Sequence, residues 1–255
     1  MVKPKKHLGQ HFLTDPNTAL KIVNYLPENT LQLLEIGPGK GILTKFILQK
    51  NIPDFKLIEL DAESVEYLLL NFPELAGKIY QHDFLKFDLK QLFDGKWTII
   101  GNFPYNISSQ ILFRVLEFRN SVNVVVGMFQ KEVAERIAAS PGNKTYGILS
   151  VLTQAYYKIE YLATIREGVF FPPPKVKSAV IRLTRNDVEN LDCDESLFFG
   201  VVKTAFNQRR KTLRNALGKM GVKDIMEIQE FMEKRAEQLS VNDFIKITSF
   251  LSIQK

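Results

Sequence analysis

The residues best suited to chemistry are Asn102, Phe103, Pro104 and Tyr105, which follow an apolar run at residues 97–100. That run is short and rich in residues that favour β-structure, so it predicts a buried strand whose carboxyl end carries the four residues. Ligands of open α/β sheets bind at such strand ends. An asparagine oxygen and a turn carbonyl can both accept hydrogen bonds from an amine, and a tyrosine ring can stack on a planar base. The alternative is an ordinary strand-to-helix turn with Asn102 as a helix cap.

A glycine loop, residues 37–41, lies between a predicted strand at residues 31–36 and a segment whose apolar residues have helical spacing. This order is typical of the first unit of a nucleotide-binding α/β fold. Ile42 stands where the dinucleotide fingerprint has its third glycine or alanine, and the ending of a P-loop is absent. The loop therefore suits a ligand with little or no phosphate, unless it is a plain turn.

Acidic residues end the next two predicted strands. Glu59 lies about twenty residues beyond the glycine loop, an offset at which a carboxylate can bind both hydroxyls of a ribose. Asp83 can accept a hydrogen bond from an adenine amino group, and Phe84 can lie on the ring. Each carboxylate alone is more often a solvated strand end or a helix cap. Together with the glycine loop and Asn102, they predict one ligand that lies across the strand ends.

Composition narrows the class of protein. The chain has 255 residues, 45% of them hydrophobic and 24% charged, as in globular proteins. No apolar run approaches the ~18 residues of a transmembrane helix, and the basic start has no apolar segment behind it, so we expect neither a membrane span nor a signal peptide. Cys193 is the only cysteine, and His7, His11 and His82 lack the spacing of metal ligands, so we expect no disulfide, no metal and a cytoplasmic location.

A polar, acidic stretch without periodicity at residues 185–195 predicts a domain boundary. Residues 1–185 then form an α/β domain with a basic N-terminal arm, and residues 186–255 form a small helical domain. Two strands, at residues 159–165 and 176–183, are expected to close the sheet in antiparallel fashion. The three prolines between them cannot lie in a central strand and predict an exposed connection.

The net charge of +6 favours a polyanionic partner. The clearest cluster of positive charge is Arg209, Arg210, Lys211 and Arg214. The sequence predicts a helix over residues 209–220 that carries this cluster, followed by two short helices. Lys211 and Arg214 would then share one face of the helix. Such a run is usually a solvated face. Next to a domain with a pocket for a base, it favours binding of nucleic acid.

Several segments resemble one family. Residues 35–41 (Glu-Ile-Gly-Pro-Gly-Lys-Gly) resemble the first motif of S-adenosylmethionine-dependent methyltransferases, and residues 102–105 resemble the N-P-P-Y-type motif of adenine amino-methyltransferases. Further segments resemble the small-subunit ribosomal RNA adenine dimethyltransferases, namely residues 8–13, 170–178, 205–214 and 235–240. The match runs essentially from end to end, in the family's order.

The resemblance implies a Rossmann-like methyltransferase sheet, mostly parallel with antiparallel closing strands, and a small all-α C-terminal domain that recognises RNA. It implies transfer of methyl groups from S-adenosyl-L-methionine to the amines of two adjacent adenines. These adenines lie in the 3′-terminal hairpin loop of small-subunit (16S) ribosomal RNA within an assembly particle, during ribosome biogenesis. A cytoplasmic monomer without a membrane or metal partner is expected.

The resemblance also assigns residues. It implies that the catalytic residues are Asn102, Phe103, Pro104 and Tyr105. The cofactor-binding residues are His11, Leu13, Gly37, Glu59, Asp83 and Asn102. The RNA-binding residues are Phe170, which is expected to form a wall opposite Tyr105, and Arg209, Arg210, Lys211 and Arg214.

Two positions depart from the family pattern. His11 replaces the more usual Asn, so we expect it to bind through its backbone, and Phe103 replaces the commoner Leu, a change in size that we expect to be tolerated.

The nearest rival is a large-subunit ribosomal RNA adenine methyltransferase of the antibiotic-resistance type. A DNA adenine methyltransferase fits less well, because no additional recognition domain is evident in the sequence. An assembly factor that has lost catalysis is a rival from another class, and the intact residues 102–105, Glu59 and Asp83 argue against it.

Overall fold

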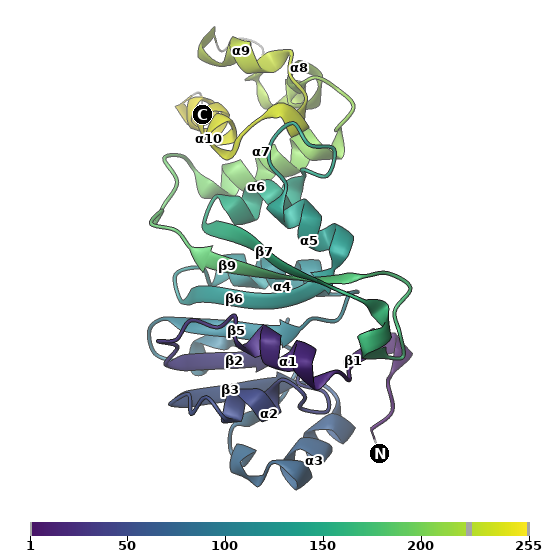
Figure 1. The fold of residues 1–255 in the computed structure, drawn as a ribbon. Helices are drawn as coiled ribbons and strands as arrows, with labels where there is room; N and C mark the ends of the chain where they lie inside the picture. The colour runs from purple at the N-terminus through teal and green to yellow at the C-terminus, as the bar shows by residue number, and fades with distance from the viewer. Residues whose placement is uncertain (1, 223–225, 254–255) are drawn as a thin grey trace. The chain divides into compact units, whose positions relative to one another are not determined.

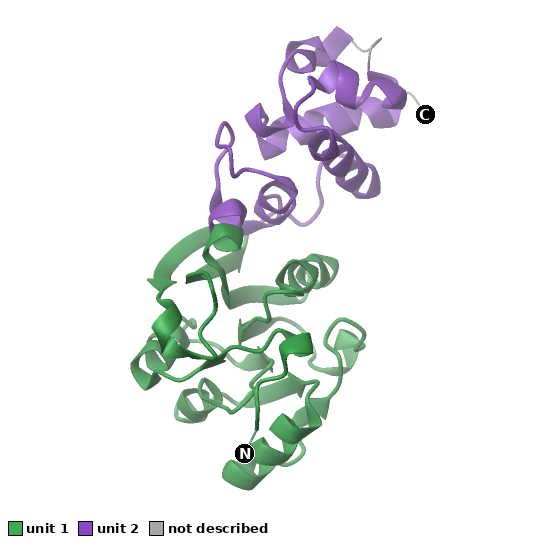
Figure 2. Cartoon of the chain, turned by 90° about the vertical axis from the view of Figure 1, so that its right-hand side faces the viewer, with its two compact units in different colours: residues 1–134, 159–185 green, residues 135–158, 186–255 purple. Residues whose placement is uncertain are grey.

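The computed structural model describes residues 2–222 and 226–253. The chain separates into two compact units, one made of Met1–Ala134 and Ile159–Arg185, the other of Glu135–Lys158 and Asn186–Lys255 (Figure 2). The polar stretch at residues 185–195 predicts that residues 135–158 belong to the first domain. In the structure they group with the C-terminal helices. The reason is that α6 (Ile148–Gln154) contacts both α7 (Glu195–Asn207) and α10 (Val241–Ile253).

A mixed sheet forms the centre of the first unit (Figure 1). In spatial order its described strands are β4 (Ile79–Gln81), β3 (Asp54–Glu59), β2 (Gln32–Ile36), β5 (Trp97–Asn102), β6 (Val122–Gln130), β9 (Ser178–Arg185) and β7 (Tyr157–Ile165). The pairs from β4 to β6 are all parallel, and β9 runs antiparallel to β6. The expected Rossmann-like, mostly parallel sheet is therefore confirmed, and β9 is one of its two predicted antiparallel closing strands.

Helices cover both faces of this sheet. They are α1 (Pro16–Val23), α2 (Thr44–Leu48), α3 (Ala62–Asn71) and α4 (Ser108–Glu117). The next helix, α5 (Lys131–Ala138), directly follows β6 and continues from the first unit into the second. In Figure 1, α1 and α2 lie in front of the strands and α4 lies behind them. Asp15 caps the start of α1, because its carboxylate accepts a hydrogen bond from the Thr18 amide at 2.8 Å. Since both faces are covered, β2 and β5 are buried along most of their length.

A short antiparallel ribbon connects the start of the chain to its later part. In this ribbon β1 (Phe12–Leu13) pairs with β8 (Phe170–Phe171), and the partners are Phe12 with Phe171 and Leu13 with Phe170. The pairing brings the N-terminal segment beside the proline loop, residues 172–177, that leads into β9. It therefore positions both segments relative to the strand ends.

The second unit is helical, with a core that contains Phe198, Phe206 and Phe244. Its C-terminal part comprises α7, α8 (Leu213–Ala216), α9 (Gln229–Met232) and α10. The prediction of one helix over residues 209–220 is wrong. Residues 208–210 form a turn, and only α8 and the 3₁₀ turn Gly218–Met220 are helical. The Leu213 amide donates to the Lys234 carbonyl, and Thr212 forms a β-bridge with Arg235, so tertiary pairing interrupts the helical path.

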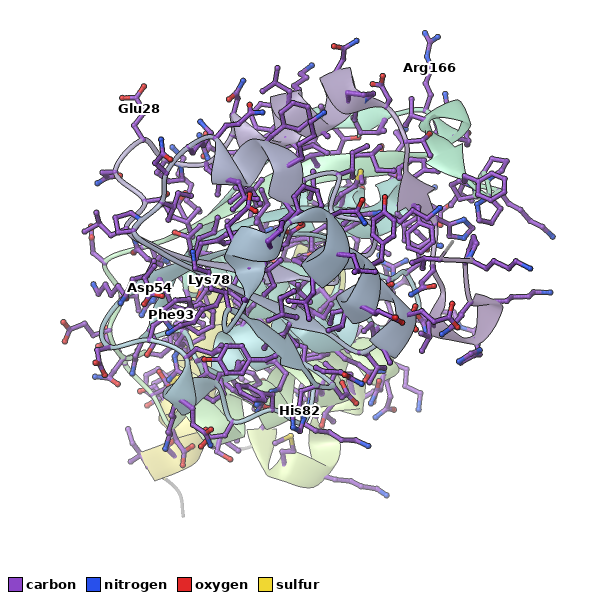
Figure 3. The ribbon with its side chains drawn as sticks, turned by 90° about the horizontal axis from the view of Figure 1, so that it is seen from below. Glu28, Asp54, Lys78, His82, Phe93 and Arg166 are labelled. Carbon is purple, nitrogen blue, oxygen red and sulfur yellow. The ribbon has the colours of Figure 1, made fainter. Side chains whose placement is uncertain are left out.

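Glu28 and Arg166 of the first unit are exposed and point away from its core (Figure 3). Within the part of the chain that the structure describes, no helix is long and apolar enough to cross a membrane.

Candidate active site

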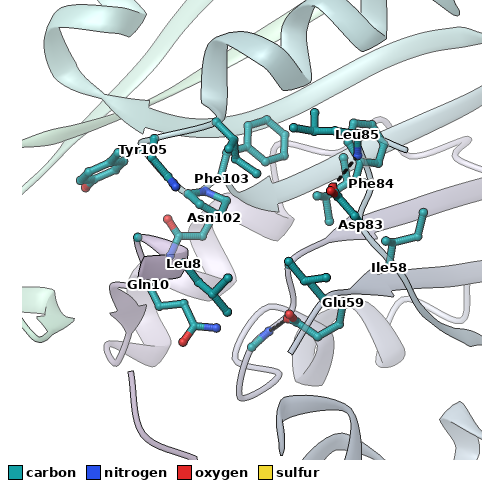
Figure 4. A pocket seen from close by; sticks show the side chains of 18 of the residues that line it. Leu8, Gln10, Ile58, Glu59, Asp83, Phe84, Leu85, Asn102, Phe103 and Tyr105 are labelled. Carbon is teal, nitrogen blue, oxygen red and sulfur yellow. Dashed lines mark hydrogen bonds between the residues drawn. The ribbon is translucent and has the colours of Figure 1, made fainter. Parts of the chain in front are cut away.

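A pocket with a volume of about 170 Å³ opens beyond the carboxyl ends of β2, β3 and β5 (Figure 4). The structure brings most of the predicted site residues together on its wall, namely His11, Gly37, Glu59, Asp83, Asn102, Phe103, Pro104 and Tyr105. They come from separate segments of the chain, and parallel strands place them at one edge of the sheet.

Asn102 ends β5 with its side chain held in one orientation. Its amide nitrogen Nδ2 donates to the main-chain carbonyl of His11 at 2.9 Å. A carbonyl oxygen only accepts, so Nδ2 must face His11, and the oxygen Oδ1 remains as an acceptor. The side chain can therefore accept a hydrogen bond from an amine in the pocket.

Tyr105 is fixed at two points. Its ring stacks on the His11 imidazole with 5.5 Å between ring centroids and 28° between planes, and its hydroxyl lies 2.6 Å from the Ser178 hydroxyl. His11 is itself held, because its Nδ1 donates to the Pro172 carbonyl at 2.7 Å. Burial raises the pKa of Tyr105, so its hydroxyl stays protonated at neutral pH. The ring is a rigid, neutral surface for a planar group.

Phe103 is packed over two glycines that face each other on β5 and β6. A Cβ on Gly127 would lie 2.5 Å from the Phe103 ring, and a Cβ on Gly101 would lie 2.7 Å from it. The ring also meets Phe129 edge to face at 5.1 Å. The two glycines thus make room for the aromatic ring of Phe103. Gly127 was not among the predicted site residues.

Glu59 is 5% exposed at the end of β3 and accepts two backbone hydrogen bonds. The Gly39 amide donates to Oε2 at 3.0 Å and the Asp61 amide donates to Oε1 at 2.9 Å. Burial nevertheless raises the pKa of this carboxyl. Gly39 has a φ of 56°, and a Cβ there would lie 2.8 Å from the Phe12 ring, so glycine is required for this approach.

Glu35 is a buried carboxyl at the start of the glycine loop. It lines a smaller cavity together with Leu13, Gly37 and Asn102. Thr44 donates to its Oε2 at 2.7 Å, whereas Oε1 is buried and has no hydrogen-bond partner among the described residues. Burial raises the pKa of Glu35 to about 8, and the charge of Glu59 adds to the effect.

Asp83 follows β4 and lies on the opposite side of the pocket from Asn102 in Figure 4. Its Oδ1 accepts a hydrogen bond from the Leu85 amide at 2.9 Å, which fixes the carboxylate in the turn. Phe84 is 4% exposed and lines the pocket beside it. An acceptor next to an aromatic ring suits the amino edge and the face of a purine.

The comparison with known proteins decides the family. The model of the family "Ribosomal RNA adenine dimethylase" matches residues 1–253. The chain belongs to this family. It is 56% identical over 250 residues to the Ribosomal RNA small subunit methyltransferase A of Parabacteroides distasonis, a match that covers 97% of this chain and 94% of the relative. The protein of the same name from Flavobacterium johnsoniae is also 56% identical, over 249 residues, with 97% and 95% of the two chains covered.

Solved structures agree with this assignment. A dimethyladenosine transferase from Plasmodium falciparum superposes with a TM-score of 0.78 at 25% identity and covers 93% of this chain and 96% of that one. The 23S rRNA methyltransferase ErmE has the same fold, with a TM-score of 0.68 at 22% identity and coverage of 93% and 99%. The family assignment makes the protein a methyltransferase.

The N-terminal arm of the methyltransferase forms part of the pocket wall, from His7 to Phe12. Lys5 fixes the arm through two ion pairs. Its Nζ contacts the buried Asp61 carboxylate and lies 3.1 Å from Oε1 of Glu63. The sequence predicts only a basic arm and two lining residues here. The partners lie more than fifty residues apart in the chain, so no local pattern indicates the pairing.

Leu13 and Phe170 do not line the main pocket of the methyltransferase. Both are 4% exposed and pack in the apolar core, where they pair across the β1–β8 ribbon. The expectation that Phe170 forms a wall opposite Tyr105 is therefore corrected, because its ring faces the core. Phe171, its neighbour, is 58% exposed.

The four basic residues at positions 209, 210, 211 and 214 fall into two groups: two that form ion pairs and two that do not. Arg209 bonds to Glu237, with 3.2 Å between Nε and Oε2, and Arg214 bonds to Glu233, with 2.8 Å between Nε and Oε1. Arg210 and Lys211 are exposed, and neither has an acidic partner among the described residues. Within this cluster, only these two present unpaired charge. Within the same described ranges, no group of three or more His, Cys, Asp or Glu side chains is arranged to hold a metal ion.

Proposed function

We propose that this protein uses S-adenosyl-L-methionine to dimethylate the exocyclic amines of two adjacent adenines in the 3′-terminal hairpin loop of small-subunit (16S) ribosomal RNA, as a step of ribosome biogenesis. The observation that carries the proposal is the Asn102 amide. Its bond to the His11 carbonyl leaves Oδ1 as an acceptor in the same pocket as Tyr105, Glu59 and Asp83. The names of the relatives from Parabacteroides and Flavobacterium support the substrate.

The side chains around the pocket fit S-adenosylmethionine. Glu59 offers carboxylate oxygens for ribose hydroxyls, and Asp83 with Phe84 suits the adenine. Gly37 has φ 64° and no atom within 4 Å of the place where a Cβ would stand, which leaves room for a ligand along the loop. The unpaired Oε1 of Glu35 suits the ammonium group of the methionine end. When bound, the cofactor supplies an electrophilic methyl group.

Asn102 and Phe103 act on the target amine. The lone pair of an adenine amino group is delocalised into the ring, so the nitrogen is a poor nucleophile. If its two N–H groups donate to Asn102 Oδ1 and to the Phe103 carbonyl, a pyramidal nitrogen is favoured and the lone pair becomes available. Correct placement supplies much of the acceleration. No general base is needed before attack, because the amine proton becomes acidic once the nitrogen is alkylated.

Tyr105 holds the base once it has left the RNA stack. His11 covers one face of the Tyr105 ring, so the base stacks on the other face. Pro104 has a fixed φ and keeps the turn between Asn102 and Tyr105 stiff. The side chain of His11 thus supports the site, in addition to its backbone contact with Asn102.

We assign the helical unit to RNA recognition, with Arg210 and Lys211 as its phosphate-binding residues, since these two carry unpaired charge. Arg209 and Arg214, which are paired with Glu237 and Glu233, shape the turn that presents them. We further propose that the enzyme acts as a cytoplasmic monomer on an assembly particle of the small subunit.

The test is incorporation of methyl groups from labelled S-adenosylmethionine into ribosomal subunits that lack the modification. We expect label in small subunits only, confined to two adjacent adenines near the 3′ end of the RNA. Label in large-subunit RNA would identify the rival adenine methyltransferase instead. Tight binding to small subunits without any incorporation would support an assembly factor that has lost catalysis.

A further inference from the structure

An exposed aromatic ring that the proposed mechanism does not use lies on the short ribbon whose other strand lines the pocket. Phe171 is 58% exposed, whereas the neighbouring Phe170 is buried. Phe171 pairs in the β1–β8 ribbon with Phe12, which lines the pocket. Exposed aromatic rings that stand singly are common on protein surfaces, so its surroundings must decide whether it has a role.

The proline loop that begins after Phe171 is linked to Tyr105 through His11 at its start and through Ser178 at its end. At its start, the Pro172 carbonyl accepts a hydrogen bond from His11, whose ring stacks on Tyr105. At its end, the Ser178 hydroxyl lies 2.6 Å from the Tyr105 hydroxyl. The loop therefore runs from the His11-covered face of Tyr105 to the hydroxyl edge of its ring, and Phe171 directly precedes the loop residue that contacts His11.

The exposed side of this loop combines apolar surface with positive charge. Val176 is 40% exposed, and Lys175 and Lys177 are exposed on either side of it, without an acidic partner among the described residues. Aromatic platforms with basic residues beside them are the usual binding surface for single-stranded nucleic acid, because each base has a face to stack and each phosphate carries a charge. A surface for another protein would not need this alternation.

We propose that Phe171 is the stacking platform for the nucleotide adjacent to the adenine held on Tyr105, and that Lys175 and Lys177 bind the phosphates of the same strand. The inference rests on the proposed function, since two adjacent adenines must approach the same pocket in turn. While one base occupies the pocket, its neighbour stays stacked on Phe171, which keeps the strand in register for the second transfer.

The test measures the affinity of the protein for a labelled RNA hairpin with two adjacent adenines in its loop, by fluorescence anisotropy and without turnover. A stacked base contributes ~1–3 kcal/mol, so Phe171→Ala is expected to weaken binding by about 5- to 150-fold. Phe171→Trp keeps a ring and is expected to bind within about threefold of the unchanged protein. The matched control is Leu70→Ala, which truncates a side chain that is 74% exposed on α3 and does not line the pocket.

Two results would overturn the proposed role of Phe171 as a stacking platform. One is that Phe171→Ala binds the hairpin as tightly as Leu70→Ala does, and the other is that Phe171→Trp loses as much affinity as Phe171→Ala. Because the assay needs no methyl transfer, it separates this inference from the proposed function, which fails only if the unchanged protein does not methylate small subunits. In that assay, Phe171→Ala is expected to leave a larger share of the adjacent adenines with only one of the two modified.

Discussion

The amide nitrogen of Asn102 donates to the main-chain carbonyl of His11 across 91 positions of sequence, at 2.9 Å. This bond joins the end of a central strand to the N-terminal segment and determines which atom of Asn102 faces the pocket. The acceptor that the proposed chemistry requires is thus oriented before any substrate binds. Such an oriented group needs no reorganisation during the reaction.

Replacement of Asn102 is expected to separate catalysis from binding. Asn102→Ala removes the acceptor and should lower the rate of methyl transfer at least about a hundredfold, the usual cost of losing one oriented hydrogen bond in a reacting site. Asn102→Asp keeps acceptor oxygens but cannot donate to the His11 carbonyl, so it should also fail. Single-turnover rates on small subunits, with cofactor affinity measured by calorimetry, test this. A rate for Asn102→Asp close to that of the unchanged enzyme would show that the His11 bond is dispensable.

The contact between Gly127 and Phe103 predicts a coupled pair. Gly127→Ala places a Cβ against the rings of Phe103 and Phe129, at 2.5 and 2.6 Å if neither ring moves. It should lower the free energy of unfolding by about 1–3 kcal/mol. Phe103→Leu should relieve part of that loss in the double variant. Urea unfolding of the four proteins gives the coupling energy, expected at about 0.5–3 kcal/mol. Strictly additive losses would contradict the packing described for Phe103.

Glu35 predicts a dependence of stability on pH. Its pKa is raised from 4.5 to about 8 in the folded protein by burial and by Glu59. Between these two values the folded state retains a proton that the unfolded state has lost, so the contribution of Glu35 to stability falls as pH rises through this window. The slope is at most about 1.4 kcal/mol per pH unit.

Urea unfolding of the unchanged protein and of Glu35→Gln between pH 5 and about 8 provides the measurement, since the amide cannot titrate in this range. The unchanged protein should lose stability relative to the variant as pH increases. A constant difference between the two across the window would mean that Glu35 titrates near its ordinary pKa.

The division of the basic cluster predicts different effects for its members. Arg210→Ala combined with Lys211→Ala should weaken binding to small subunits and reduce the slope of log affinity against log salt by about 1.4 to 1.8, since two phosphate contacts are lost. Arg214→Ala breaks its bonds to Glu233 and Gln229 and should mainly reduce stability. Filter binding at several salt concentrations separates the two cases. An unchanged slope in the double variant would make residues 210 and 211 an ordinary solvated surface.

Local patterns predict the first unit well, because its strand, loop and helix signals are contained in short segments. Asp15 caps α1, and Glu59 and Asp83 follow strands whose ends meet at the pocket. Parallel pairing then places these residues together without further information. The fold and most of the pocket wall follow from such signals.

Long-range pairing accounts for the errors. Phe170 and Phe171 are adjacent aromatic residues on a two-residue strand, and only its pairing with Phe12 and Leu13 decides which ring is buried. Residues 209–212 have helical spacing of charge, yet Thr212 pairs with Arg235 and ends the helical path. Neither partner is indicated by the sequence near these residues.

The most direct measurement is mass spectrometry of the 3′-terminal fragment of 16S RNA, after incubation of unmodified small subunits with the unchanged enzyme or with Asn102→Ala. With the unchanged enzyme, the fragment should gain the mass of two methyl groups on each of two adjacent adenines. With Asn102→Ala it should gain none, while the variant still binds S-adenosylmethionine. A fragment fully methylated by Asn102→Ala, or methyl groups outside the adjacent adenines with the unchanged enzyme, would contradict the assigned site and substrate.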